Sequence, residues 1–370
     1  MKIDYICISF YPVIGGTEAV VLNIAKRMAK KGHDVTIHTS NHDPNYHGKL
    51  SSEDLIEGIR VLRYRIFPLF VFFPRIGRTD VIHLFSFGDN FIIQSLLQER
   101  KKLITSPIGE EISSCKKFRI RILGSHILNR ARKILASTVY ESRFLGSHYH
   151  ISPDKILIYP FGVDASAFVS PDIELIRGDV KKCKYYVRLA RIDRVKRLDF
   201  GIRLLTKFDE QIGHVIVGPF DDEEYLKELK DLAIELGVHD RVIFTGRVSE
   251  EEKLAIVHDS LFHLVSNYEN FGVASIEAMA QGIPILAPDI EAYEGLFVHN
   301  LNALVYDYDS IDDAAEKARW LIENRELARR LGEQGKELAR TRFNWEVIVD
   351  EVEKIYFGIC KVQEIQGSLP

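Results

Sequence analysis

The chain has 370 residues, of which 46% are hydrophobic and 28% charged, and its formal net charge is −4. This length and apolar content predict a globular protein with two domains of ordinary size and exclude an intrinsically disordered chain. No apolar run approaches the roughly 18 residues of a membrane helix. The four cysteines are widely spaced: Cys7, Cys115, Cys183 and Cys360. They show no metal-binding or disulfide pattern, which fits a reducing cytoplasm.

The first half of the chain predicts alternating strands and helices. An apolar run at residues 3–9 predicts a strand at the start, so no signal peptide is expected. Helix signals run from Thr17, the expected N-cap, to Lys31, with Gly32 as the stop. Further strands are predicted at 35–39 and 81–85. Continuous apolar strands between helices are typical of a parallel sheet covered on both faces.

The second half repeats this alternation. Strands are predicted at 185–190, 214–217, 242–245, 261–265, 283–287 and 303–306. Helices are predicted at 198–208, 222–236, 250–258 and 272–281, followed by charged helical segments at 311–339 and 345–357. Two such halves, joined near 163–172, predict an α/β protein of two doubly wound, Rossmann-like domains facing one another across a cleft. Ligands of such sheets bind beyond the carboxyl ends of the strands.

Residues 266–280, at one such strand end, carry two carboxylates. Glu269 ends the loop, and Glu277 lies on an otherwise apolar helix face with no basic residue nearby in the sequence. A buried carboxylate needs a partner, and the two hydroxyls of a ribose would suit its oxygens. A helix-capping Glu269 and a Glu277 bonded to a neighbouring loop would explain the pattern equally. An anion is favoured at the start of this helix, which is opened by the backbone amides of Phe271, Gly272 and Val273.

The loop at 190–199 is rich in cations and also follows a predicted strand. Arg191 and Lys196 stand five residues apart across a turn, where they could hold a diphosphate from two sides. A basic loop that is simply solvated is the alternative interpretation.

A third segment, residues 12–18, places Gly15 and Gly16 at a strand-to-helix turn. Glycines there let the backbone approach a phosphate closely, although a plain tight turn would need them as well. Because neither G-x-G-x-x-G nor G-x-x-x-x-G-K-[S/T] is present, a dinucleotide-binding fold and a P-loop nucleotide hydrolase are disfavoured.

Together these segments resemble the family 4 retaining glycosyltransferases of GT-B fold, the glycosyl transferases group 1. The shared motifs are Gly-Gly-x-Glu at 15–18, Arg-x4-Lys at 191–196, and Glu-x7-Glu at 269–277 with Ala-Met-Ala-x-Gly-x-Pro after it. Further matching blocks lie at 80–83, 160–164 and 240–246, so the ordered set covers essentially the whole chain. The resemblance implies an acceptor-binding domain at 1–168, to which a C-terminal helix at 345–370 returns, and a donor-binding domain at 169–344.

The resemblance also implies how a nucleotide diphosphate-sugar donor would be held. Glu277 would bind the ribose, and Glu269 the hydroxyls of the sugar. Arg191 and Lys196 would bind the diphosphate and stabilise its charge as it leaves. The first domain's backbone would approach the same phosphates at Gly15 and Gly16. The loop at 246–248, which ends at Val248, would line the base through main-chain contacts. The sugar and phosphate would also be held by the amides of Phe271, Gly272 and Val273.

Members of this family generally need no metal and no cofactor, because cations and helix-end amides can replace Mg²⁺ at the diphosphate. Retention implies attack from the same face as the leaving group, with the leaving phosphate taking the acceptor's proton. Glu269, Arg191 and Lys196 are therefore the expected catalytic residues.

One departure from the family pattern concerns a histidine that many members place near the donor sugar. The corresponding segment here, residues 105–111, contains none, so main chain, Glu110 or Glu111 would have to replace it, and a reduced or lost activity is one expectation. His83 is interpreted as a satisfied histidine at the end of a strand.

The net charge hides an asymmetry between the two halves. Residues 1–170 carry 23 Lys and Arg against 15 Asp and Glu, a balance of +8, whereas residues 171–370 carry 26 against 38, a balance of −12. Two basic stretches with interleaved apolar residues, 59–78 and 116–133, suit an anionic membrane surface and a lipid-linked acceptor. A solvated basic face explains them equally, and no motif supports binding to nucleic acid.

The sequence therefore predicts a cytoplasmic, metal-independent retaining glycosyltransferase of hexosyl type, peripheral to the membrane if its basic half docks there. The acceptor would be a glycan, a lipid or a lipid-linked glycan. Two alternatives stay open: a catalytically silent GT-B binding subunit, for which the missing histidine argues, and a nucleotide-sugar 2-epimerase of the same fold.

Overall fold

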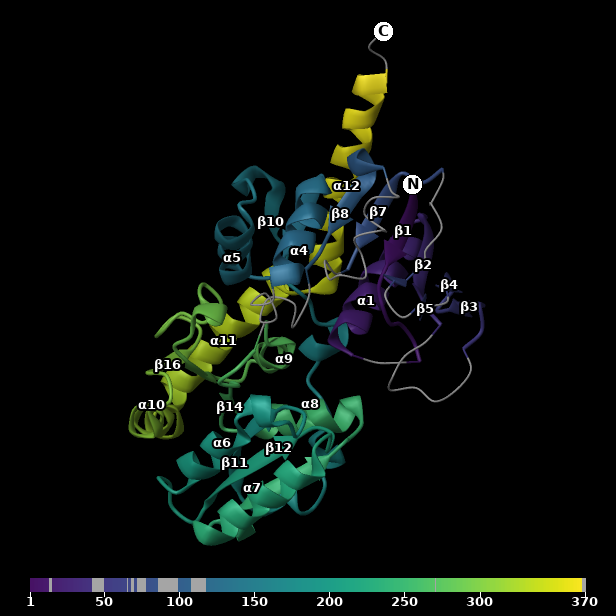
Figure 1. Cartoon of the computed structure of the whole chain (residues 1–370). Helices are drawn as coiled ribbons and strands as arrows, with labels where there is room; N and C mark the ends of the chain where they lie inside the picture. Colours follow the sequence, from purple (N-terminus) through teal and green to yellow (C-terminus); the bar gives the residue numbers. More distant parts are fainter. Residues whose placement is uncertain are drawn as a thin grey trace. The chain divides into compact units, whose positions relative to one another are not determined.

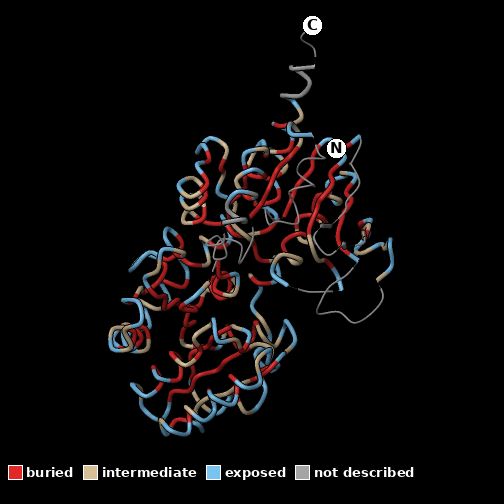
Figure 2. The backbone as a smooth tube through the Cα atoms, viewed as in Figure 1, coloured by how far each residue is buried: buried red, intermediate tan, exposed pale blue. Residues whose placement is uncertain are grey.

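The computed structural model describes the chain except for residues 13–14, 42–49, 65, 68–69, 72–77, 86–98, 108–117, 270 and 368–370. The chain divides into two compact units, Met1–Phe161 with Trp345–Pro370, and Gly162–Asn344. Each unit has buried strands inside and exposed residues on the helices and loops around them (Figure 2).

The sequence placed the first domain boundary after residue 168, whereas residues 162–168 pack with the second unit. The Val163 amide donates to the Phe343 carbonyl at 2.7 Å, and Gln281 Nε2 donates to the Ala167 carbonyl at 2.6 Å. These contacts join the segment to elements that follow it by more than a hundred residues, so local sequence could not locate the boundary.

Within the described residues, the first unit contains a sheet of eight strands (Figure 1). Its strands in spatial order are β10 (Ile156–Ile158), β9 (Lys133–Ala136), β8 (Leu103–Thr105), β7 (Val81–Leu84), β1 (Lys2–Ile6), β2 (Asp34–Ser40), β4 (Ile59–Tyr64) and β3 (Glu53–Ile56). Every pair is parallel except β3 with β4. The unit also contains the short pair β5 (Ile66–Phe67) and β6 (Phe70–Val71), and the helices α1 (Gly16–Lys30), α4 (Phe118–Arg130), α5 (Val139–Tyr149) and α12 (Trp345–Gly367).

Both faces of this sheet are covered by helices. In β1, Ile3 and Tyr5 belong to a core shared with α1 and α12, whereas Ile6 belongs to a core shared with α4 and α5. Successive residues of a strand point to opposite faces, so a strand buried on both sides reads as a continuous apolar run. The predicted sheet with two covered faces is confirmed for this unit.

The second unit contains a six-stranded sheet in which every pair is parallel. Its strands in spatial order are β13 (Val242–Gly246), β12 (Ile212–Val217), β11 (Lys184–Leu189), β14 (His263–Leu264), β15 (Ile285–Pro288) and β16 (Leu304–Tyr306). Its helices are α6 (Leu198–Leu205), α7 (Glu223–Glu235), α8 (Glu250–Asp259), α9 (Val273–Ala280), α10 (Ile311–Glu323) and α11 (Arg325–Arg342). A large core cluster joins the central strands to α6, α7 and α10.

Two local features differ from the sequence expectations. The N-cap of α1 is Gly15, not Thr17, and no side chain caps the helix; Thr17 lies inside its first turn. The antiparallel hairpin of β3 and β4 was not predicted. It is formed by a turn at Glu57 and Gly58, both with positive φ (51° and 77°), and β3 is too exposed to show an apolar pattern.

Candidate functional site

Several predicted donor-binding residues of the second unit lie on loops at one edge of its sheet. Because β11, β13 and β14 are parallel, the loops that follow them emerge at the same edge. These loops carry Arg191 and Lys196, then Val248, then Glu269. The parallel topology therefore brings together motifs that are up to 78 residues apart in the sequence.

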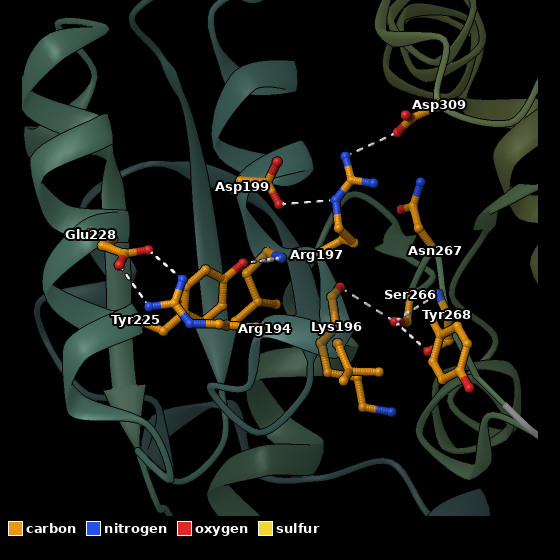
Figure 3. Close-up of polar contacts among 12 residues, drawn as sticks. Arg194, Lys196, Arg197, Asp199, Tyr225, Glu228, Ser266, Asn267, Tyr268 and Asp309 are labelled. Atoms are coloured by element: carbon orange, nitrogen blue, oxygen red, sulfur yellow. Dashed lines mark hydrogen bonds and ion pairs between the residues drawn. The ribbon is translucent and has the colours of Figure 1, made fainter. Parts of the chain in front are cut away.

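The loop after β11 is held by its own polar contacts (Figure 3). Asp193 accepts a hydrogen bond from the Val195 amide at 3.0 Å and starts a turn of 3-10 helix, Arg194–Lys196. Arg197 follows with a left-handed backbone, φ 50°, a conformation that is unfavourable for a non-glycine residue. Its guanidinium bonds Asp199 at 3.3 Å and Asp309 at 3.2 Å, which helps to hold this backbone in place.

A buried arginine donates hydrogen bonds to the main chain of the same loop. Arg188 lies in β11 with no exposed surface, and its guanidinium donates to the main-chain carbonyls of Lys196 and Arg197. Burial lowers the pKa of this guanidinium. Sequence analysis missed the residue, although an arginine within the apolar run of a buried strand is itself a signal that it serves something inside the protein.

The loop after β14 contacts the same lysine. Ser266 Oγ donates to the Lys196 carbonyl at 3.4 Å and lies 3.0 Å from the Tyr268 carbonyl (Figure 3). Tyr293 in turn donates its hydroxyl to the Ser266 carbonyl at 2.9 Å. Ser266 therefore connects the loop after β14 to the main chain of the loop after β11, where Lys196 lies.

Two of the predicted catalytic residues are in direct contact. Lys196 Nζ lies 2.6 Å from Glu269 Oε1, and the two side chains are 16% and 22% exposed. Arg191 is not part of this contact: its side chain is 56% exposed and pairs with Asp221 at 3.1 Å and Asp193 at 3.6 Å. A diphosphate carries more charge than a single carboxylate, so it could compete for both cations.

The helix that carries Glu277 begins as the sequence predicted, with a glycine. Gly272 is the N-cap of α9 and has φ 83°, where any other residue would be strained. Gly272 has no side chain with which to cap the helix, Phe271 is buried, and Val273 is exposed.

Glu277 has a partner that sequence analysis did not find. Lys253 Nζ of α8 lies 2.8 Å from Glu277 Oε2 and 2.7 Å from Glu250 Oε1. No basic residue is near Glu277 in the sequence, but the packing of α8 against α9 brings this lysine to it from 24 residues upstream. Burial nevertheless raises the pKa of the Glu277 carboxyl, and the lysine only partly opposes this effect.

The loop predicted to line the base follows β13. Gly246 has φ 71° and lies against the ring of Phe220, which a Cβ at this position would approach to 3.3 Å. Val248 is half-buried, and Ser249 caps α8 by accepting a hydrogen bond from the Glu252 amide at 3.1 Å.

The two glycines of the first unit differ in their surroundings. Gly15 lies against the carboxylate of Glu18, which also bonds the hydroxyl of Ser9, so a side chain at Gly15 would displace that carboxylate. Among the residues that the structure describes, none places a heavy atom within 4 Å of a Cβ position on Gly16, the first residue of α1. The motif Gly-Gly-x-Glu thus contains one crowded glycine and one open one.

His83 is a satisfied core histidine, as interpreted from the sequence. It is fully buried, with Nδ1 2.7 Å from the Tyr356 hydroxyl and Nε2 2.8 Å from Ser106 Oγ, and burial lowers its pKa to about 3. Glu110 and Glu111 lie outside the described residues, as do parts of both basic stretches. Along the described part of the chain, no helix is both long enough and apolar enough to cross a membrane.

Two family models match the chain: Glycosyltransferase Family 4 over residues 14–167 and Glycosyl transferases group 1 over residues 173–338. The chain is 23% identical to N-acetyl-alpha-D-glucosaminyl L-malate synthase of Bacillus anthracis, over 98% of both chains. It is 26% identical to GDP-mannose:cellobiosyl-diphosphopolyprenol alpha-mannosyltransferase of Xanthomonas oryzae pv. oryzae, over 98% of this chain and 99% of that one. The crystal structure of Anabaena HepE in complex with UDP-glucose is similar in fold, with a TM-score of 0.78, 18% identity, and coverage of 97% of this chain and 100% of that one. The chain therefore belongs to the family 4, group 1 glycosyltransferases and has their GT-B fold.

Proposed function

We propose that the protein is a retaining, metal-independent glycosyltransferase that moves a sugar from a nucleotide diphosphate-sugar to a glycan, lipid or lipid-linked acceptor. The contact between Lys196 and Glu269 at 2.6 Å is the observation that carries the proposal. It unites the Arg-x4-Lys and Glu-x7-Glu motifs, which lie 73 residues apart in the sequence, at one edge of the sheet.

The donor would bind to the second unit. Arg191 and Lys196 would take the diphosphate, Glu269 the sugar hydroxyls and Glu277 the ribose, with the amides at the start of α9 beside them and Val248 near the base. Gly15 and Gly16 would bring the backbone of the first unit to the phosphates. The binding of UDP-glucose to HepE and the GDP-mannose in the mannosyltransferase's name support donors of this class.

The proposed chemistry relies on charge stabilisation. As the bond between sugar and phosphate breaks, negative charge grows on the diphosphate, and Lys196 and Arg191 would stabilise it. The acceptor hydroxyl would attack from the same face and pass its proton to the leaving phosphate. Glu269 would orient the sugar, and no covalent intermediate on the enzyme is required.

The acceptor would be bound by the first unit, where the basic residues are concentrated. The name of the mannosyltransferase contains cellobiosyl-diphosphopolyprenol and supports a lipid-linked acceptor, whereas the name of the malate synthase contains L-malate, which is neither a glycan nor a lipid. We further propose a cytoplasmic location with docking on anionic membranes. Flotation of the protein with vesicles that contain or lack phosphatidylglycerol tests the docking, and equal partitioning into both would contradict it.

The decisive experiment measures donor cleavage and transfer with a panel of UDP- and GDP-sugars in the presence of a chelator. Lys196→Ala and Glu269→Ala should each lower the rate by about 100-fold or more, because each removes a group that acts on the transition state. Lys181→Ala and Glu174→Ala break an exposed ion pair of 3.0 Å in the same unit and should have no effect.

Proton NMR of the product would show whether the anomeric configuration of the donor is kept. Full activity in both site variants would reject the assigned site, and an inverted product would reject the retaining mechanism. A wild-type protein that binds a donor but does not cleave it would instead support the silent binding subunit.

A further inference from the structure

The contact between Lys253 and Glu277 joins two helices that no motif links. Lys253 lies on the first turn of α8, and its ammonium group bridges the carboxylates of Glu277 on α9 and Glu250 on its own helix, at 2.8 and 2.7 Å. The lysine and Glu277 are only 19% and 20% exposed, whereas Glu250 is 60% exposed. The ion pair is therefore largely shielded on the side of Glu277.

The lysine occupies only one of the two oxygens of Glu277. It bonds Oε2, and no hydrogen bond from the described residues is made to Oε1. A carboxylate oxygen can accept more than one hydrogen bond. Glu277 can therefore keep its lysine and still accept hydrogen bonds from a ligand.

We propose that Lys253 is a positioning residue for the donor, which keeps Glu277 ionised and directs its second oxygen toward the ribose hydroxyls of a nucleoside diphosphate. The inference rests on the proposed function, because it assumes that the ribose binds at Glu277. It adds a residue from outside every motif of the sequence. An ionised Glu277 only accepts hydrogen bonds, whereas a protonated one turns one oxygen into an O–H donor and accepts more weakly, so the role of the lysine is electrostatic as well as steric.

The charges around Glu277 make the lysine important. Lys253 and Glu250 of α8 face Glu277. Asp164, which directly precedes the 3-10 turn Ala165–Phe168, also acts on its charge. At the far end of α9, His258 bonds Gln281, and Lys336 of α11 lies near Gly282. Burial and the two other carboxylates raise the pKa of Glu277, while Lys253 lowers it.

The direction of the pH effect follows from these charges. In the wild type, ribose binding should weaken as the pH falls and Glu277 takes up a proton. Without the ammonium of Lys253 the pKa of Glu277 should rise further, so binding should be lost at a higher pH. Restoring a positive charge with arginine should move the loss back toward the wild-type pH.

The test is calorimetric titration of the full chain with UDP and GDP, and with their 2′,3′-dideoxy forms, between about pH 5.5 and pH 9. Lys253→Met should weaken binding of the ribose forms about tenfold near neutral pH, less at high pH, and should leave the weaker binding of the dideoxy forms unchanged. Lys253→Arg should restore most of the affinity.

Lys317→Met provides a matched control for folding and charge. Lys317 pairs with Asp313 on α10. The two side chains are 20% and 21% exposed, close to the 19% and 20% of Lys253 and Glu277. This variant should keep both the affinity and the pH profile. Thermal unfolding of every variant would show that the folded state is retained.

The outcomes separate the inference from the function on which it rests. Wild-type protein that binds neither UDP nor GDP would overturn the proposed donor site and this inference with it. Wild-type protein that binds a nucleotide while Lys253→Met shows an unshifted pH profile would overturn the inference alone. So would an equal loss of affinity for ribose and dideoxy forms, because a purely structural role predicts that result.

Discussion

The two last helices of the chain, α11 and α12, follow one another directly but belong to different units and pack by different means. α11 packs against the second unit through glycine: a Cβ on Gly332 would lie 2.0 Å from the carbonyl oxygen of Gly282, so main chain touches main chain. α12 packs against the first unit through large side chains, which include Trp345, Val352 and Tyr356.

Charged side chains add to the attachment of α12. Lys31 at the end of α1 pairs with Asp350 at 2.7 Å and with Glu353 at 2.9 Å, and His33 also contacts Glu353 at 2.7 Å. The two helices should therefore respond to different mutations. α11 cannot accept added volume, whereas α12 should be weakened by lost hydrogen bonds and, to a smaller extent, by lost charge.

The largest effect is expected for Gly332→Ala. The added methyl group would meet a main-chain carbonyl that cannot rotate away, so α11 or the end of α9 must move, and we expect a loss of about 3 kcal/mol in the free energy of unfolding. Hydrogen exchange of peptides from α9 and α11 at increasing urea concentration would measure the loss.

Gly358→Ala in α12 is the matched control for this prediction. Outside the backbone of its own helix, no described residue has a heavy atom within 4 Å of its Cβ position, so alanine should raise helix stability by about 0.5–1 kcal/mol. Similar responses of the two glycine variants would contradict the contrast between the helices.

An intermediate effect is expected for Tyr356→Phe in α12. The change removes the hydroxyl that bonds the fully buried His83 at 2.7 Å, and an unsatisfied buried imidazole nitrogen should lower the free energy of unfolding by about 2 kcal/mol. Tyr11→Phe, at a residue that is 38% exposed in the same unit, should change it by less than about 0.5 kcal/mol. Urea unfolding curves of both variants test this, and equal midpoints would refute the role of the hydroxyl.

The smallest effect is expected for Glu353→Gln. Burial tends to raise the pKa of this carboxyl, but hydrogen bonds from Lys31 and His33 outweigh it and hold the pKa below the usual value. The pair should contribute at most about 1 kcal/mol, and less at high salt.

The pH dependence of that contribution has a definite sign. Because the folded-state pKa of Glu353 is lowered, the stabilisation is complete above the pKa of an unfolded glutamate, about 4.3, and is lost as the pH falls through the folded value. The difference between wild type and Glu353→Gln in urea unfolding should therefore shrink on acidification. Glu351→Gln, which removes an exposed pair within α12, should change the free energy of unfolding by less than Glu353→Gln does.

Much of the second unit could be predicted because its signals are local. Asp222, Ser249 and Ser310 cap the helices that follow them, each by accepting a hydrogen bond from a backbone amide, and the apolar strands lie where the sequence placed them to within a few residues. Glu269 and Lys196 could be selected from their motifs, but their contact depends on the order of the parallel strands.

The contacts that could not be predicted depend on packing between distant segments. Lys253 looks like an ordinary charged residue of an exposed helix until α8 is packed against α9. Arg188 donates to the main-chain carbonyls of Lys196 and Arg197, and Arg197 has a left-handed backbone that its residue type does not indicate. An arginine in an apolar strand indicates a role inside the protein, but its partners, like the partner of Lys253, cannot be identified from the sequence because the fold sets their positions.

The division of the first unit between two stretches of the chain has a consequence for the order of folding. The residues of α12 that fill its core, among them Val349, Val352 and Tyr356, are synthesised after the whole of the second unit. Domains fold largely as they leave the ribosome, so residues 162–344 should reach their native state while one face of the first sheet is still uncovered. The first part of the protein to be made is therefore expected to be the last to mature, and its exposed apolar strands would be a natural target for chaperones during that delay.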